Sequence, residues 1–264
     1  MHKNSYNQGV CNRTLARGSE MSRYHIEKRK WDEKAAALLA KRRNWVHLET
    51  YDAIFAERNT LRPVYKYFTG IDEPGIIVLD YGCGSGWSAL LLATKAEQVK
   101  AFDISEGSIR NLYRSIEYNM MDNLEAQVAN GEELPYGNDE FDYVFGYGIL
   151  HHLTLNKCLP EIARVLKPGG RAAFCEPLAH NPLINLYRYI KHHRVERHLG
   201  TDRPLKYSDI PTFQKYFPKV QFRESSFFRD RYSSLISLDR VFLKIPLIRR
   251  YVCYVTILLE NSVS

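Results

Sequence analysis

The stretch LDYGCGSGW, residues 79–87, decides how the rest of the chain is interpreted. It follows a short apolar run, and three alternating glycines, Gly82, Gly84 and Gly86, stand behind the acidic Asp80. Glycines at a turn from a strand into a helix permit unusual φ angles and let a ligand approach the backbone closely. The stretch therefore predicts a ligand-binding turn between a β-strand and an α-helix.

The spacing of these glycines argues against a dinucleotide ligand. A dinucleotide fingerprint reads G-x-G-x-x-G, whereas here the third glycine comes one residue early and Trp87 occupies the last position. Asp80 stands two residues before the first glycine, where its charge would repel a pyrophosphate. An acidic residue there suits a cationic ligand or an amino-acid ammonium group instead.

A second acidic residue, Asp103, ends the next apolar run, VKAFDIS (99–105). Its carboxylate can accept hydrogen bonds from both hydroxyls of a ribose. S-adenosylmethionine combines a ribose with an ammonium group and a sulfonium, and it lacks a phosphate. The glycine run and Asp103 together predict a site for this cofactor.

The order of apolar runs around these motifs predicts the fold class. After a linker rich in helix breakers (69–75), short β-type runs alternate with helical stretches, which is typical of βαβ units around a parallel sheet. We expect strands near 76–80, 98–102, 125–129, 141–146 and 170–176, and helices over 86–95, 105–120 and 156–166. LKPGG (166–170) should end a helix and turn the chain into the next strand. Two later runs, 219–224 and 251–260, should complete the sheet, with a basic amphipathic helix between them.

The segments outside this pattern suggest further parts. Residues 1–20 are polar, and we expect a flexible tail there. Residues 21–70 carry a helical pattern and are expected to form an N-terminal lid. The main domain should extend over 71–264, with a less regular substrate cap around 177–218.

Composition bounds the function only loosely. The chain has 264 residues, 45% of them hydrophobic, and a net charge of +7, as in an ordinary globular protein. Its acidic centre lies between basic flanks, a pattern that fits bound nucleic acid, anionic substrates, a membrane surface or simply solvated helices. The five cysteines form no CxxC pair, and we expect neither a zinc site nor a disulfide framework. A cytoplasmic protein without a secretion signal is the expected setting.

Four stretches together resemble the class I S-adenosylmethionine-dependent methyltransferases, in particular the small-molecule group with the signature LDxGCGxG. They are VLDYGCGSGWSALLLA, VKAFDIS, ANGEELPYGNDEFDYVFGYGILHHL and CLPEIARVLKPGGRAAFCEP, and they cover roughly residues 75–180. The resemblance implies a Rossmann-like α/β fold with a mostly parallel seven-stranded sheet, helices on both faces, an N-terminal helical lid and a small cap.

The resemblance also implies a set of cofactor-binding residues. The cofactor loop would consist of Asp80, Gly82, Cys83, Gly84 and Gly86, while Asp103 and Ile104 would hold the ribose and adenine. Asn130, Gly131 and Glu132 would follow the third strand, and Tyr147 would border the methionine end. Asn130 departs from the family, which often has Asp there, although its carbonyl could still address the adenine amino group.

Three residues are candidates for the chemistry. Some phosphoethanolamine and related methyltransferases have a histidine after a similar ILH stretch and pair it with a lid tyrosine, so the resemblance suggests His151 as base or orienter and Tyr24 as its partner. Structural hydrogen bonding by His151, and mere coverage of the cofactor by Tyr24, are the alternatives. Which of His151 and His152 faces the pocket is left open. Glu176, at a strand end, could bind the acceptor or satisfy His180 or Arg188. The run KHHRVERHLG (191–200) is better explained as an exposed basic helix than as metal ligands.

The sequence thus predicts an enzyme that transfers a methyl group to oxygen, nitrogen or carbon of a small organic acceptor, such as a secondary metabolite. An RNA-directed enzyme is one rival, disfavoured because the chain has no appended RNA-binding module. A protein that binds the cofactor without transferring a methyl group is another. A lipid- or quinone-directed enzyme, weakly associated with a membrane through the basic segment 240–250, is the last. A homodimer is compatible with the sequence.

Overall fold

The protein is described here by a computed structural model that covers residues 23–40, 51–182, 185–186, 203–226, 240–245 and 251–262. The expected tail at 1–20 and the run 191–200 lie outside these residues. So does most of the helix expected between the last two strands.

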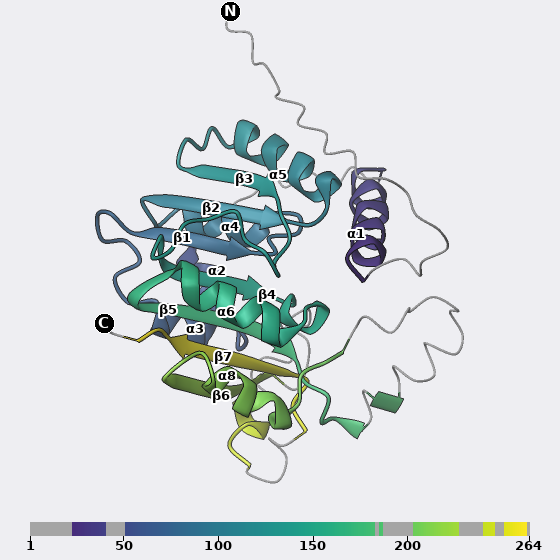
Figure 1. The fold of residues 1–264 in the computed structure, drawn as a ribbon, viewed down its shortest axis with the longest axis vertical. Helices are drawn as coiled ribbons and strands as arrows, with labels where there is room; N and C mark the ends of the chain where they lie inside the picture. The colour runs from purple at the N-terminus through teal and green to yellow at the C-terminus, as the bar shows by residue number, and fades with distance from the viewer. Residues whose placement is uncertain are drawn as a thin grey trace, which may run out of the picture.

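The seven expected strands are all present and form one sheet in the order β3-β2-β1-β4-β5-β7-β6 (Figure 1). Six pairings join them; the four among β1 to β5 are parallel, and β7 runs antiparallel to both of its neighbours. The strands are β1 (Ile77–Tyr81), β2 (Gln98–Asp103), β3 (Leu124–Val128), β4 (Phe141–Tyr147), β5 (Leu166–Pro177), β6 (Lys219–Ser226) and β7 (Tyr254–Glu260). The predicted Rossmann-like fold with a mostly parallel seven-stranded sheet is confirmed.

The helices also follow the predicted alternation. They are α1 (Arg23–Ala40), α2 (Tyr51–Glu57), α3 (Arg62–Tyr67), α4 (Trp87–Ala93), α5 (Glu106–Tyr118), α6 (Leu155–Val165) and α8 (Ile210–Gln214), with short 3-10 turns η1 (Leu150–His152) and η2 (Tyr207–Asp209). None of the helices in the described part of the chain is both long and apolar enough to cross a membrane.

Strand β5 differs from the expectation at its start. Leu166 already pairs with Phe141, and regular pairing resumes only at Arg171 with Tyr143, so LKPGG forms an irregular part of the strand rather than a separate turn. Gly169 adopts a positive φ of 71° there, and its N–H donates to Ser262 at 3.1 Å. Residues 261–262, which follow β7, therefore pair with this segment.

Alternate residues of the strands build two cores, one on each face of the sheet. Val78, for example, faces the core formed with α2 to α5, whereas its neighbour Leu79 faces the core formed with α6 and α8. Both side chains are fully buried. This two-sided burial explains why the strands read as continuous apolar runs.

The strand order reverses between β1 and β4, where helices pass from one face of the sheet to the other. In open α/β sheets ligands bind outside the carboxyl ends of the strands at such a point. Helix α1 stands beyond the carboxyl ends of β1 and β2 and packs on α5 (Figure 1). It therefore covers the place where a ligand is expected.

Candidate active site

A cavity of about 490 Å³ lies under α1 at the carboxyl ends of β1, β2 and β4. This volume is in the range of small-molecule sites. The cavity is lined by Arg23, Tyr24, Glu27, Trp31, Lys34 and Ala35 of α1, by Gly82 to Ser85, Trp87 and Ser88, by Phe102 to Ile104, by Ser108 and Asn111 of α5, and by Ala129 to Glu132, Tyr147 to Ile149, His152 to Thr154 and Lys157. The site therefore draws on three of the four stretches that the sequence singled out and on the N-terminal helix.

The alternating glycines have different roles in the turn. A Cβ atom at Gly86 would lie 2.4 Å from Leu112 Cδ1, so this glycine lets α4 pack against α5. A Cβ at Gly84 would meet nothing within 4 Å, although its φ is also positive, at 53°. Gly82 and Gly84 line the cavity, whereas Gly86 does not. Gly84 thus leaves backbone open to a ligand, and Gly86 serves packing.

Asp103 stands at the end of β2 on the cavity wall. Its Oδ2 accepts a hydrogen bond from Gly84 N–H, and its Oδ1 accepts one from Ser105 N–H, each at 2.9 Å. Burial raises the pKa of this carboxyl group, and the two backbone hydrogen bonds oppose the rise. Each oxygen keeps a second lone pair, and the neighbouring Ile104 lines the same cavity. The geometry fits a carboxylate that accepts hydrogen bonds from vicinal hydroxyl groups.

Asp80 lies behind the glycine loop and is not among the lining residues. Its Oδ2 accepts a hydrogen bond from Ser88 Oγ at 2.7 Å. Burial raises the pKa of Asp80 to about 7, Ser88 opposes the shift, and the nearby charge of Asp103 adds to it. Asp80 would therefore act on a bound cation through its field and through the loop that it supports.

The segment after β3 forms a second wall of the cavity. Asn130 Oδ1 accepts a hydrogen bond from Glu132 N–H at 3.0 Å, and Tyr81 Oη donates one to the carbonyl oxygen of Gly131. Partial burial would raise the pKa of Glu132, but hydrogen bonds from Thr154 and Lys157 outweigh it and lower the pKa. Glu132 thus anchors the start of α6. Asn130, whose carbonyl is already engaged, keeps an amide N–H₂ to offer a ligand.

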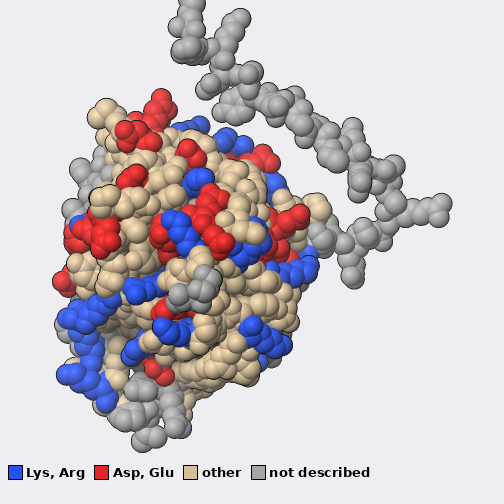
Figure 2. All heavy atoms as spheres, turned by 60° about the vertical axis from the view of Figure 1, so that its left-hand side comes forward, with Lys and Arg blue, Asp and Glu red and all other residues tan. Residues whose placement is uncertain are grey.

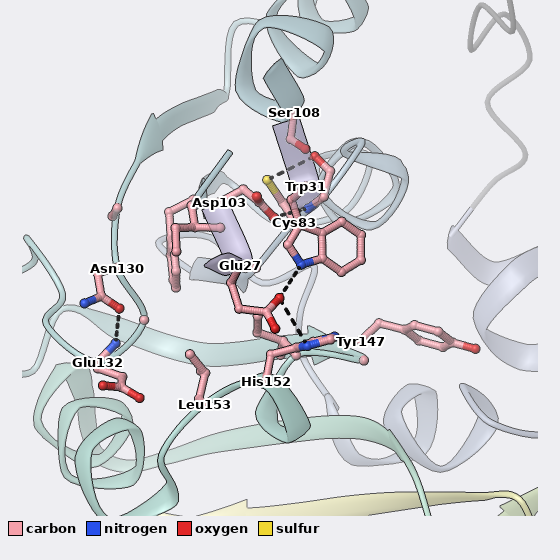
Figure 3. A pocket seen from close by; sticks show the side chains of 18 of the residues that line it. Glu27, Trp31, Cys83, Asp103, Ser108, Asn130, Glu132, Tyr147, His152 and Leu153 are labelled. Carbon is pink, nitrogen blue, oxygen red and sulfur yellow. Dashed lines mark hydrogen bonds and ion pairs between the residues drawn. The ribbon is translucent and has the colours of Figure 1, made fainter. Parts of the chain in front are cut away.

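Aromatic side chains close the far side of the cavity. Tyr147, at the end of β4, packs edge-on against Trp87 with ring centroids 5.5 Å apart. Figure 3 shows Tyr147 on the opposite side of the view from Asn130 and Glu132. Cys83 also lines the cavity, and its thiol is buried within the glycine loop.

The structure separates the two adjacent histidines. His152 lines the cavity, whereas His151 does not. His151 Nδ1 lies 2.7 Å from Glu176 Oε2, and Glu176 Oε1 accepts hydrogen bonds from the N–H groups of Ile149 and Leu150 at 2.8 Å. Glu176 is fully buried. Its contacts hold the 3-10 turn η1 in place, so His151 and Glu176 form a supporting pair behind the cavity wall.

Helix α1 adds Glu27 and Trp31, which the sequence analysis did not single out, to the predicted Tyr24. Glu27 accepts a hydrogen bond from Trp31 Nε1 at 3.1 Å, and its Oε2 lies 3.5 Å from His152 Nδ1 (Figure 3). Tyr24, at 36% exposure, lines the same cavity. Glu27, Trp31 and Tyr24 recur at the three- and four-residue spacing of one helix face. This spacing could have indicated that one face of the helix lines a site. It does not do so by itself, because a helix face with charged side chains is usually exposed to solvent.

Helix α1 is fixed to α5 by a carboxylate. Asp32 Oδ1 accepts hydrogen bonds from Ser105 Oγ at 2.6 Å and from Gly107 N–H at 3.1 Å, at the first turn of α5. Lys28 bridges Asp32 and Glu106, each at 3.0 Å.

The expected substrate cap does not contribute to the cavity in the described part of the chain. None of the described residues of 177–218 lines the cavity, and α8 packs on α6 and β6 instead.

Comparisons with known proteins identify the fold family. The family model described as "Methyltransferase domain" matches residues 78–170. A ubiquinone/menaquinone biosynthesis C-methyltransferase UbiE from Rickettsia akari (strain Hartford) is 40% identical over 102 residues, which are 36% of this chain and 41% of that protein. The chain thus spans about two fifths of the length of the curated relatives it matches.

Solved structures agree in fold over a larger part of the chain. The geranyl diphosphate C-methyltransferase from Streptomyces coelicolor A3(2), in complex with Mg2+, geranyl diphosphate and S-adenosyl-L-homocysteine, has a TM-score of 0.59 at 13% identity and covers 92% of this chain and 98% of its own. The [4+2]-cyclase SpnF has a TM-score of 0.60 at 15% identity and covers 96% of this chain and 100% of its own.

The reversed strand order, the glycine turn and the acidic strand end define the class I methyltransferase fold. Residues 78–170 match the methyltransferase domain model, and the solved structures share the fold, as the resemblance had implied.

Proposed function

We propose that the protein transfers a methyl group from S-adenosylmethionine to a small organic acceptor bound in the cavity beneath α1. The observation that carries the proposal is the convergence of Gly84, Asp103 and Asn130 on one cavity that α1 covers. These groups are an open backbone, a buried carboxylate and an amide. The bound cofactor would supply an electrophilic methyl group on a sulfonium.

The lining residues fit the parts of this cofactor one by one. Asp103 accepts hydrogen bonds from the ribose hydroxyls, and Ile104 packs on the adenine. The Asn130 amide donates to a ring nitrogen of the purine. Asp80 lies behind the loop and accepts a hydrogen bond from Ser88, and a cationic ligand in front of the loop would favour its ionised form. Tyr147 and Trp87 border the end where the methyl group would lie.

Positioning supplies a large part of the rate of a methyl transfer, because the attacking atom, the methyl carbon and the leaving sulfur must be in line. Helix α1 would act as the lid that excludes water and holds the acceptor against the cofactor. The acceptor would enter the space between Tyr24, Trp31 and Tyr147.

A quinone-type ring is a second candidate acceptor, and the similarity to the UbiE C-methyltransferases favours it. RNA is less well supported. On the face in Figure 2, basic and acidic side chains are interspersed over the middle, and basic ones predominate only towards the lower left. A cyclase has the same fold, so the experiment below must also distinguish methyl transfer from a reaction without it.

Binding and transfer test the proposal separately. Calorimetric titration of the purified chain should show S-adenosylhomocysteine binding, with no comparable signal for NAD or ATP. Methyl-labelled S-adenosylmethionine should then label a small acceptor. Preference for NAD or ATP would overturn the assignment of the site. Tight binding of S-adenosylhomocysteine without transfer to any acceptor would instead point to a reaction like that of a cyclase.

A further inference from the structure

A carboxylate and an imidazole from distant parts of the chain meet at the wall of the cavity. Glu27 belongs to α1, His152 belongs to η1, and their side chains are 6% and 8% exposed. Glu27 Oε2 lies 3.5 Å from His152 Nδ1 and also accepts the hydrogen bond from Trp31 Nε1. Figure 3 shows Glu27 between these two rings. The two side chains are thus almost excluded from water, and they lie at the cavity into which the methyl group of the cofactor would point.

Charged and titratable groups from α1, η1 and β5 surround the pair. From α1, Lys30 lies 3.9 Å from Glu27, and Arg23 reaches the carbonyl oxygen of His151 at 3.5 Å. From η1, the ring of His151 lies 4.0 Å from that of His152. Glu176, from β5, already pairs with His151. Glu27 is therefore the carboxylate that faces His152 and can stabilise a positive charge on it.

The lining of the cavity narrows the class of acceptor. Trp31 packs edge-on against His152 with ring centroids 5.6 Å apart, and Trp87 and Tyr147 line the same space. Flat aromatic walls favour a flat ring between them. A buried carboxylate–imidazole pair favours an acceptor that must lose a proton, since it can hold that proton as a charge-paired imidazolium.

We propose that Glu27 and His152 form the acid–base pair of this site, and that the acceptor is an aromatic ring bearing a hydroxyl group. This inference rests on the proposed methyltransferase function. The acceptor would lose its hydroxyl proton to the His152 imidazole, and the electron pair left on the acceptor would form the bond to the methyl carbon. The carbon–sulfur bond breaks with its pair going to sulfur, giving a neutral thioether. Glu27 balances the charge on His152 and fixes its ring.

The pair can be tested without an acceptor by nuclear magnetic resonance on histidine-labelled protein saturated with S-adenosylhomocysteine. The signal of His152 is assigned by its loss in His152→Gln. In Glu27→Gln we expect its titration midpoint to fall by roughly one to three pH units, because an opposite charge is lost at short range. Glu27→Asp, which keeps the charge, should restore part of the shift. Glu33→Gln, on the exposed face of the same helix, is the matched control.

An unchanged midpoint in Glu27→Gln would overturn the pairing. Methyl-labelling of hydroquinone and 1,4-naphthohydroquinone, compared with aniline, tests the acceptor class. We expect transfer to the hydroxylated rings only, and a loss of kcat on the order of 100-fold in Glu27→Gln but not in Glu33→Gln. Labelling of aniline alone would overturn the acceptor class. Failure of S-adenosylhomocysteine to bind the wild-type chain would instead overturn the proposed function, and calorimetry distinguishes the two results.

Discussion

Asp103 Oδ2 accepts a hydrogen bond of 2.9 Å from the backbone N–H of Gly84 and thereby ties the glycine loop to the end of the neighbouring strand. The same carboxylate faces the cavity with its remaining lone pairs. One side chain thus shapes the loop and, in the proposed site, would also bind the cofactor. A substitution at Asp103 should therefore act on cofactor affinity in two ways.

Asp103→Asn should weaken the binding of S-adenosylhomocysteine. It removes the charge and one acceptor, and hydrogen bonds to a charged group contribute about 1.5–3 kcal/mol, or roughly 10- to 100-fold in Kd. Calorimetric titration measures this change. Asp122→Asn, at an exposed position on the loop before β3, is the control and should leave Kd unchanged. Equal affinities of Asp103→Asn and the wild type would remove Asp103 from the cofactor site.

Gly84→Ala should act mainly on cofactor binding, and Gly86→Ala mainly on stability. Both positions have positive φ, so both variants carry a backbone cost of about 1–2 kcal/mol. Only the alanine at 86 also collides with Leu112, at 2.4 Å. Thermal unfolding should show a larger loss of Tm for Gly86→Ala. Titration should show the larger loss of cofactor affinity relative to stability for Gly84→Ala, and the reverse order would contradict the assigned roles.

The buried Asp80 should make stability depend on pH. Its pKa is raised from 3.8 to about 7 in the folded protein by burial, with the charge of Asp103 adding to the rise. The folded state therefore binds the proton more tightly than the unfolded state, and the contribution to stability is full below about pH 4 and lost as pH rises towards 7. Asp80→Asn should lose less stability than the wild type between pH 5 and pH 8. Denaturant unfolding at these two values measures the difference, and parallel losses in both proteins would refute the assignment.

The contact of Asp32 with the first turn of α5 should control how α1 covers the cavity. Partial burial would raise the pKa of Asp32, but hydrogen bonds from Ser105, Gly107 and Lys28 lower it. The ionised group thus helps to hold α1 above pH 3.8, and this contribution is lost as pH falls below that value.

Asp32→Ala should therefore loosen α1 without unfolding the sheet. Hydrogen exchange of the α1 amides should become faster at neutral pH, while exchange in β1 and β4 stays slow. Glu33→Ala, at the next and exposed position, should leave both unchanged. Equal protection of α1 in Asp32→Ala and the wild type would show that other contacts hold the helix.

The sequence by itself determined the sheet and predicted which residues the structure brings together around the glycine turn. Buried parallel strands such as β1 consist of continuous apolar residues, and the glycines and Asp103 stand at strand ends, so local pattern and order along the chain were sufficient to place them. Gly84 and Gly86 could not be told apart by sequence. Their difference depends on whether Leu112, from another helix, lies beside the missing side chain.

Which residues form the proposed acceptor side could be told only from the tertiary structure. His151 and His152 are neighbours in sequence, and no periodicity shows which one faces the cavity, because η1 is a single turn. His151 contacts the buried Glu176 behind the cavity wall, whereas His152 contacts Glu27 on α1. These contacts join residues far apart in the chain. They depend on how α1 docks on α5, which is a matter of packing geometry rather than of local sequence.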